Sequence, residues 1–189
     1  MNTRFLGMIF VIGTLFIFLN GFRIWGTSSP FPDTLSSLAY LLWGISGVCG
    51  IFGLIRLNAL GSNAVARAFG FLPIIGFASM VVGECLHLLG LINADDPLYN
   101  MLSAIGWIGI LVGMLVVGIL TIAARTWSGW RRFVPLLTVV MVPIAFGIGQ
   151  ALGSQDLGAL LFYSGWLLLG LVIATTEPTR GVQPGLVTG

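Results

Sequence analysis

Charged side chains are scarce in this chain of 189 residues, and lysine is missing altogether. Only 7% of the residues are charged and 57% are hydrophobic, whereas soluble domains carry about 25% charged residues. So little charge cannot cover a surface that faces water, and we therefore expect lipid to surround most of the chain. The absence of lysine also excludes a lysine Schiff base of the kind that retinal proteins use.

Residues that carry catalytic or metal chemistry are equally sparse. The single histidine is His87, and the two cysteines, Cys49 and Cys85, lie in apolar runs with neither CxxC nor zinc-site spacing. HExxH, P-loop and GxGxxG motifs are absent, and the FYSG segment at 162–165 lacks the first glycine of the GxSG serine protease signature. We therefore expect no enzyme, no resident metal and no nucleic-acid partner.

The chain is rich in apolar runs of membrane-spanning length. One crossing needs about 20 apolar residues. Runs of that kind lie at 5–23, 34–55, 68–92, 98–124, 132–152 and 157–175. We predict an all-α protein, a polytopic six-helix transmembrane bundle that forms a single membrane domain over residues 1–175. A tail rich in Pro, Thr and Gly follows at 176–189.

The arginines between these runs indicate an orientation. With the N-terminus in the cytoplasm, seven of the eight arginines fall on the cytoplasmic side and Arg23 alone falls outside, which satisfies the positive-inside rule with one exception. The first run lacks the small-residue cleavage site of a signal peptide, so we expect it to be retained. We predict a multi-pass protein of the cell membrane with cytoplasmic N- and C-termini.

Aspartates stand just before the second, fourth and sixth predicted helices, at Asp33, Asp96 and Asp156. A carboxylate at this position accepts the free backbone N–H groups of the first turn and faces the positive end of the helix dipole. Asp96 is followed by Pro97, and proline is preferred at the first helical position. We expect these aspartates to cap helices and not to bind a metal or a substrate.

The same aspartates mark a repeat. Each is followed after 10 or 11 residues by a tryptophan beside a glycine, namely Trp43, Trp107 and Trp166. This spacing predicts three two-helix hairpins, each of which returns to the same side of the membrane, in a pseudo-threefold arrangement around the membrane normal. The hairpin repeats cover about 4–56, 67–125 and 131–175.

Glycines recur along the predicted helices at spacings that suit close packing. In lipid, small residues allow two helix backbones to approach and so carry helix association. The positions concerned are Gly44, Gly47, Gly50, Gly53, Gly76, Gly83, Gly90, Gly109, Gly113, Gly149 and Gly153. We expect most of them to pack helices within the bundle. A glycine-rich face left over would be a contact for other membrane subunits. Aromatic residues near the ends of the runs suit anchoring at the membrane interface; these are Trp25, Tyr99, Trp127 and Trp130.

The third run contains two titratable side chains, Glu84 and His87. They are three residues apart and therefore share a helix face. If the helix reaches residue 92, His87 lies roughly 7 Å and Glu84 roughly 12 Å from its outer end, at 1.5 Å per residue. A charged acid at depth costs about 2.5–3.5 kcal/mol, and Gly83 and Gly90 flank the pair, so we expect this face to point into the bundle.

Two interpretations of the pair stay open. In the first, Glu84 hydrogen-bonds to His87, and polar groups of other spans complete a polar interior; the candidates are Asn20, Gln150, Tyr163 and Ser164. In the second, the pair is functional, either as a pH- or ion-responsive site or as a cofactor site in which His87 is an axial ligand of a haem or of a chlorophyll-type magnesium. A di-iron site is excluded, because it needs a second ExxH motif and further carboxylates.

Residues 29–57, SPFPDTLSSLAYLLWGISGVCGIFGLIRL, combine a proline turn, a capped helix start and a glycine-spaced span, and weaker copies begin at 96 and 156. In these features residues 4–175 resemble the HdeD-like acid-resistance membrane proteins, which are built from short two-helix repeats. The resemblance implies a non-enzymatic role in envelope stress and supplies no catalytic residues. Glu84 and His87 match no requirement of that family.

Three functions are therefore considered. The first is a non-enzymatic structural or accessory component of the membrane, or an envelope-stress protein. The second is a membrane subunit that binds a pigment, haem or quinone near His87. The third is a small-solute transport or substrate-binding subunit with a polar cavity, for which the first helix lacks the Ala-xxx-Ala seam of the six-span vitamin importer subunits. The sequence identifies no particular cofactor.

Overall fold

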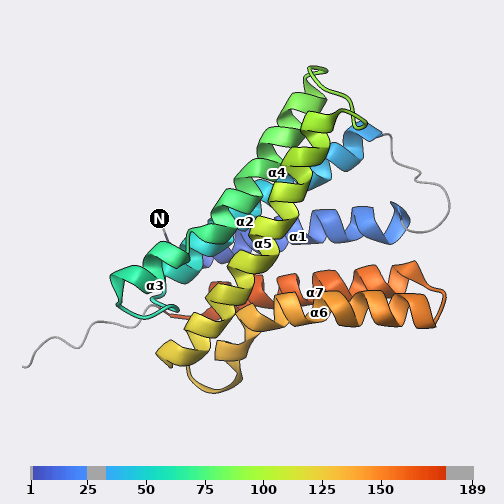
Figure 1. Ribbon diagram of the computed structural model, residues 1–189. Helices are drawn as coiled ribbons and strands as arrows, with labels where there is room; N and C mark the ends of the chain where they lie inside the picture. The colour runs from blue at the N-terminus through green and yellow to red at the C-terminus, as the bar shows by residue number, and fades with distance from the viewer. Residues whose placement is uncertain (1, 25–32, 178–189) are drawn as a thin grey trace, which may run out of the picture.

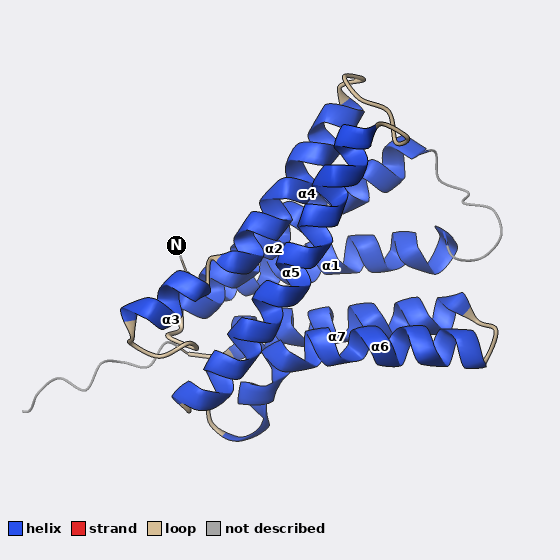
Figure 2. Cartoon of the chain, in the orientation of Figure 1, coloured by secondary structure: helices blue, strands red, loops and turns tan. Residues whose placement is uncertain are grey.

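The computed structural model describes residues 2–24 and 33–177, and for residues 21–24, 33, 155 and 156 the backbone alone. Within these ranges the chain is helical and contains no strand (Figure 2). The elements are α1 (Thr3–Ile24), α2 (Asp33–Arg56), α3 (Ala64–Phe69), α4 (Leu72–Leu88), α5 (Pro97–Ala124), the 3-10 helix η1 (Gly129–Phe133), α6 (Val134–Ala151) and α7 (Gln155–Thr175). Six helical stretches are long and apolar enough to cross a membrane. The predicted all-α six-helix bundle is confirmed.

The third span differs from its prediction at both ends. It starts with the short helix α3, and α4 ends at Leu88 instead of near residue 92. Gly90 has a φ of +69°, a left-handed conformation that glycine adopts readily. The N–H of Leu91 then donates to the carbonyl of Leu86 at 3.0 Å and the N–H of Gly90 to that of His87 at 2.9 Å, which is a Schellman ending. His87 therefore lies in the last turn of the helix.

The helix caps agree with the prediction at one aspartate and differ at another. Asp96 caps α5, because its side chain accepts a hydrogen bond from the Leu98 N–H at 2.8 Å. The cap of α7 is Ser154, which accepts from the Leu157 N–H at 3.4 Å, so the prediction of Asp156 as the cap is wrong. The helix begins before Asp156, and that residue belongs to its first turn. The side chain of Asp33 lies outside the described residues.

The helices form two groups that cross and then diverge (Figure 1). One group contains α2, α4 and α5, and the other contains α1, α6 and α7. The turns at 57–63 and 125–128 lie at the end where the groups converge, which we call the arginine end; the turns at 89–96 and 152–154 lie at the opposite end, which we call the aspartate end. Successive spans pack side by side, and α7 packs on α1 to close the ring. The contact between α5 and α6 is the least extensive in this ring.

The centre of the bundle is an aromatic cluster around Trp43. Its ring lies 5.5 Å from that of Trp166, 5.8 Å from that of Trp107 and 5.3 Å from that of Phe77, measured between centroids. Trp43 and Trp166 are fully buried. The three tryptophans of the predicted repeat therefore lie in one cluster, and α1–α2, α4–α5 and α6–α7 pack as hairpins. The threefold relation between the hairpins stays a prediction.

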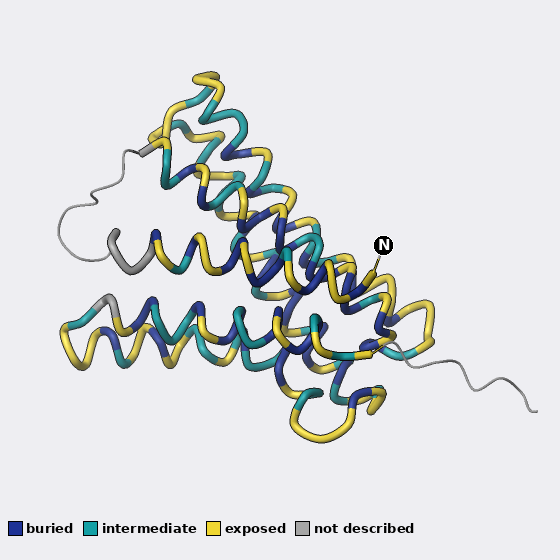
Figure 3. The backbone as a smooth tube through the Cα atoms, turned by 180° about the vertical axis from the view of Figure 1, so that it is seen from behind, coloured by how far each residue is buried: buried dark blue, intermediate teal, exposed yellow. Residues whose placement is uncertain are grey.

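The helices have buried and exposed sides (Figure 3), and glycines hold helix backbones close together inside the bundle. A methyl group on Gly76 would lie 2.7 Å from the carbonyl oxygen of Gly106, so α4 and α5 touch through their backbones. Gly90 and Gly153 behave differently: both have positive φ values, and a methyl group added at either would meet no atom within 4 Å. These two glycines end helices, and the prediction that they pack against neighbours is wrong.

Candidate functional site

Glu84 is a buried acid one turn from the aspartate end of α4. Only 5% of the residue is exposed. Its Oε1 accepts a hydrogen bond from the hydroxyl of Tyr99 on α5 at 2.7 Å, and the Ser37 hydroxyl of α2 lies beside the same carboxyl. Its Oε2 is buried without a partner in hydrogen-bond geometry among the described residues. The carboxyl therefore faces helices of the bundle, as the sequence predicted, and retains one free oxygen.

His87 does not serve as the hydrogen-bond partner of Glu84. Its Nδ1 lies 3.2 Å from the carbonyl oxygen of Ile92 in the following turn, and its half-buried ring lies 5.5 Å from the ring of Tyr99. Because a carbonyl oxygen only accepts, this contact places a hydrogen on Nδ1. The predicted bond between Glu84 and His87 is replaced by the bond to Tyr99, since α4 ends right after the histidine.

All three tyrosines of the sequence gather around Glu84. Besides Tyr99, Tyr40 of α2 lies near Glu84, and Tyr163 of α7 lies near Tyr40. We call the six residues concerned the tyrosine cluster: Ser37, Tyr40, Glu84, His87, Tyr99 and Tyr163. It connects four helices, and it reaches from the end of α4 to the far side of the bundle.

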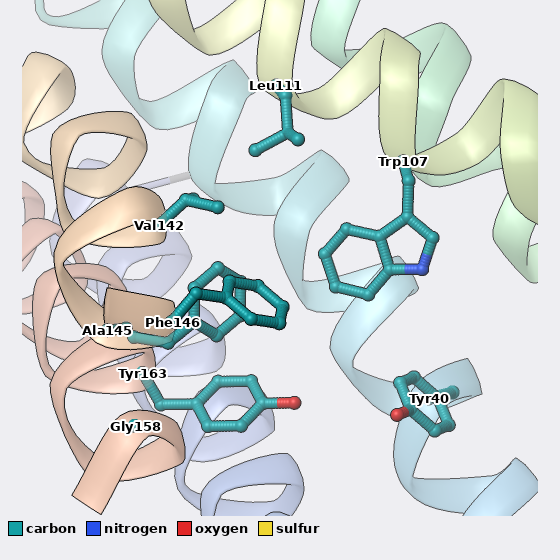
Figure 4. A pocket seen from close by; sticks show the side chains of 9 residues that line it. Tyr40, Trp107, Leu111, Val142, Ala145, Phe146, Gly158 and Tyr163 are labelled. Carbon is teal, nitrogen blue, oxygen red and sulfur yellow. The ribbon is translucent and has the colours of Figure 1, made fainter. Parts of the chain in front are cut away.

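A groove lies next to this cluster, where α5 diverges from α6 and α7. Its volume is about 340 Å³, and nine residues line it: Tyr40, Trp107, Leu111, Val142, Ala145, Phe146, Gly158, Phe162 and Tyr163. Figure 4 shows Tyr40 and Tyr163 on facing sides with their hydroxyl groups pointing toward one another, and Trp107 above them. The two hydroxyls and the indole nitrogen of Trp107 are the polar side-chain groups of an otherwise apolar, aromatic wall. The groove is therefore suited to an apolar molecule with a small polar group.

The structure brings together only some of the residues predicted for a polar interior. Glu84, His87 and Tyr163 belong to the tyrosine cluster. Asn20 is buried between α1 and α2, where its Oδ1 accepts from Ser36 at 3.5 Å and its Nδ2 is left without a partner in the described part of the chain.

Gln150 and Ser164 lie elsewhere. Both are exposed on the outside of the bundle, and the Ser164 hydroxyl donates to the carbonyl of Leu161 in its own helix. A polar cavity lined jointly by Asn20, Glu84, His87, Gln150 and Tyr163 is consequently not formed.

Sequence reasoning missed three members of the site, namely Ser37, Tyr40 and Tyr99. Tyr40 stands alone in an apolar run and was indistinguishable from a core aromatic residue. Tyr99, which lies near a span end and was interpreted as an interface anchor, instead donates to Glu84. One feature could have indicated both tyrosines: the three tyrosines of the sequence lie near the aspartate ends of their helices, as Glu84 does.

Among residues 2–24 and 33–177, no group of three or more His, Cys, Asp and Glu side chains is placed to hold a metal ion. His87 does not line the groove, so a tetrapyrrole bound to its ring would have to lie outside it. Comparison with protein-family models, with curated proteins and with solved structures finds no match. The resemblance to the HdeD-like proteins therefore stays a prediction.

Proposed function

We propose that this protein is a non-enzymatic integral membrane protein whose groove binds a lipophilic molecule with a hydrogen-bonding head group, of the isoprenoid quinone class. The observation that carries the proposal is the pair of tyrosine hydroxyls, from Tyr40 and Tyr163, inside an apolar groove of about 340 Å³. Small-molecule sites typically occupy about 300–1,000 Å³ and combine apolar walls with a few polar groups that orient the ligand.

The chemistry of the walls favours a quinone over the other candidates. Quinone oxygens accept hydrogen bonds, and the tyrosine hydroxyls can donate them. Trp107 and Phe162, whose rings lie 6.0 Å apart, offer faces and edges to a planar ring. A haem or chlorophyll is less well served, because His87 is not in the groove. A charged solute is disfavoured because the lining contains no charged side chain.

We also propose an orientation of the chain in the membrane. We place the arginine end in the cytoplasm, because the arginines with described side chains belong to it and the positive-inside rule then holds; they are Arg4, Arg56, Arg67, Arg125, Arg131 and Arg132. Arg23 and Arg180 lie outside the described side chains. A role as an accessory subunit or in envelope stress stays a prediction.

The experiment is a binding measurement on the full chain in mild detergent. A short-chain ubiquinone is titrated while tryptophan fluorescence is recorded, since a quinone stacked near Trp107 quenches its emission. Organic extracts of the purified protein are analysed by mass spectrometry for copurifying quinone. Saturable quenching and an extracted quinone support the proposal. A visible spectrum with haem or chlorophyll bands, or no saturable quenching, contradicts it.

Two valines on α6 supply a matched pair of variants. Val142 lines the groove, while Val140 lies on the outer surface of the same helix with 42% of its area exposed. Val142→Phe fills the groove and should weaken quinone binding at least about tenfold, which corresponds to about 1.4 kcal/mol. Val140→Phe should leave the affinity unchanged. Equal effects of the two substitutions would place the ligand elsewhere.

A further inference from the structure

A second hollow lies at the arginine end, between the turn that leads into η1 and the end of α7. Its volume is about 300 Å³, and polar side chains make up most of its lining; they are Thr126, Trp127, Arg131, Thr175, Thr176 and Glu177. We call it the polar hollow. The apolar span of α7 ends at Thr175, so the hollow lies where the helices leave the hydrocarbon, at the level of the lipid phosphates.

Two hydrogen-bond donors on the wall of the polar hollow have no partner. The half-buried side chain of Arg131 forms no ion pair with any described residue. Only 4% of Trp127 is exposed, and its indole N–H has no acceptor in the described part of the chain. The indole groups of Trp43 and Trp166 are also unpartnered but lie in the aromatic core. Phosphate oxygens accept from both guanidinium and indole donors.

The charges around the polar hollow favour an anion. Glu177 contributes a carboxylate to the lining, but its Oε1 accepts from Nη2 of Arg4 at 3.0 Å, so its charge is balanced by that arginine. The charge of Arg131 is not balanced in this way. Arg125 and Arg132 belong to the same stretch of chain, outside the lining, and add to the positive potential.

The threonines of the polar hollow offer acceptors to a ligand. The hydroxyls of Thr175 and Thr176 donate to carbonyls one turn back in α7, at 2.8 and 2.6 Å. The hydroxyl of Thr126 donates to the carbonyl of Ala59 at 3.0 Å. Since their hydrogens are used in this way, the three oxygens present lone pairs to a ligand hydroxyl. The hollow thus combines donors for a phosphate with acceptors for hydroxyl groups.

An apolar groove of about 330 Å³, which we call the outer groove, lies beside the polar hollow along α6 and α7. The two share η1, because Trp130 lines the outer groove and Arg131 lines the polar hollow. On α7, Leu168 lines the outer groove and Thr175 lines the polar hollow. These two residues are seven apart, so they share a helix face and lie about 10 Å apart along the axis. The outer groove therefore lies at the depth of lipid acyl chains.

We propose that the polar hollow and the outer groove together bind one anionic phospholipid of the phosphatidylglycerol class. The phosphate accepts from Arg131 and Trp127, the glycerol hydroxyls donate to the threonine oxygens, and one acyl chain occupies the outer groove. Basic pockets between membrane helices recognise lipid head groups in this manner. The site shares no lining residue with the quinone groove, so it is independent of the proposed function. A lipid bound there links η1 and α6 to the end of α7.

The test is a lipid titration of the full chain in mild detergent. Dioleoyl phosphatidylglycerol is added, and the occupancy of the first bound lipid is measured by native mass spectrometry. Dioleoyl phosphatidylcholine has the same chains and a phosphate, but it carries a cation and no hydroxyl donor. It should bind about tenfold more weakly, and equal affinities would overturn the assignment of the head group. Inorganic phosphate should not displace the lipid. Displacement would assign the polar hollow to free phosphate.

Two neighbouring arginines of η1 supply a matched pair of variants. Arg131→Gln removes the cation of the polar hollow and should weaken binding of phosphatidylglycerol about tenfold or more, as expected for a hydrogen bond to a charged group. Arg132→Gln removes the same charge from the next residue, which lines neither the hollow nor the outer groove. Its effect should be less than about threefold. Equal effects would mean that the general charge of the arginine end attracts the lipid, and would overturn the site.

Val140→Phe tests the outer groove separately and keeps the proposal testable if Arg131→Gln does not fold. Val140 lines the outer groove, so the larger ring should displace the acyl chain and weaken lipid binding about fivefold, while the quinone affinity stays unchanged. Val82→Phe is the control, because Val82 is 48% exposed on α4 and lines neither the outer groove nor the polar hollow. Wild-type lipid affinity in Val140→Phe would overturn the lipid site and leave the quinone proposal intact.

Discussion

The two sides of α5 pack in opposite ways. Toward α4, the helix presents Gly106, Gly109 and Gly113, and the backbones of the two helices touch. Toward α6, the glycine of α5 that meets a neighbouring backbone is Gly118, near the arginine end, where a methyl group would lie 2.6 Å from the Cα of Leu136. Nearer the aspartate end the same helix presents Trp107 and Leu111, and the groove begins there.

The difference shows how residue size determines whether a cavity forms between helices in lipid. Small residues allow van der Waals contact between backbones along a whole seam. Large aromatic residues such as Trp107 and Phe162 hold the helices apart, because they pack ring against ring and leave space beside them. The contact of α5 with α4 is thus closely packed, and the contact of α5 with α6 leaves a groove beside it.

The largest expected effect is at the contact between α4 and α5, the tight seam of the bundle. Gly76→Leu places side-chain atoms 2.7 Å or less from the backbone of α5, which cannot move without separating the helices. We expect a loss of about 3 kcal/mol or more in unfolding free energy, at the upper end of overpacking effects. Thermal unfolding in detergent measures it. Gly147→Leu is the control, because nothing lies within 4 Å of a methyl group added at that glycine. Equal losses would show that the contact between α4 and α5 contributes no more to the unfolding free energy than the open position at Gly147.

A smaller effect is expected at Gly118, where α5 contacts α6. Gly118→Leu collides with Leu136, but α5 and α6 touch over a short stretch and can separate slightly. We expect a loss of about 1–3 kcal/mol in unfolding free energy, with a weaker quinone affinity because the groove widens. The same unfolding and quenching measurements apply. A loss larger than that of Gly76→Leu would reverse the comparison of the two seams.

The α4–α5 contact and the groove side of the bundle also differ in the hydroxyl groups that they contain. Tyr99→Phe removes the hydroxyl that donates to Oε1 of Glu84 and leaves a buried carboxyl unsatisfied, which should cost about 1–3 kcal/mol of unfolding free energy. Tyr163→Phe removes a hydroxyl at the groove and should cost only about 0.5–1.5 kcal/mol, while weakening quinone binding. If Tyr163→Phe proves the more destabilising of the two, the cluster depends on the groove side and not on the α4–α5 side.

The smallest effect is expected for Glu84→Gln. The amide oxygen can still accept from Tyr99, and its NH2 group replaces the unpartnered Oε2 and can donate to Ser37. We expect expression and unfolding temperature close to those of the wild type. Glu84→Leu, which removes all hydrogen bonding, serves for comparison. Loss of folded protein on Glu84→Gln would mean that the tight side of the bundle requires an ionised carboxylate.

The spans were predictable because their apolar length is a local property of the sequence. The helix ends were less predictable, because the end of α4 depends on the left-handed conformation of Gly90. The inward direction of Glu84 followed from its cost in lipid. The hydrogen-bond partner of Glu84 could not be predicted from the sequence, because Tyr99 comes from the next helix. The two residues meet through the register that Gly76 and Gly106 impose on α4 and α5.

The groove had no counterpart in the sequence patterns. It results from the divergence of α5 from α6, which depends on the summed packing of all six spans. Tyr163 was identified as a candidate because it is polar and lies in a span, whereas Gln150 and Ser164 met the same criterion and are exposed. Polarity within a span does not specify which face of the helix carries it.

Helix α6 contains Pro143, between the groove residues Val142 and Ala145. Proline has no N–H, so the carbonyl of Val139 receives no donor from that position, and the helix bends more easily there than at its other turns. The half of α6 toward its C-terminal end can therefore tilt while the half near Leu136 stays packed against Gly118. A change in the bend of α6 at Pro143 would therefore alter the width of the groove beside Val142 and Ala145 and leave the contact of Leu136 with Gly118 in place.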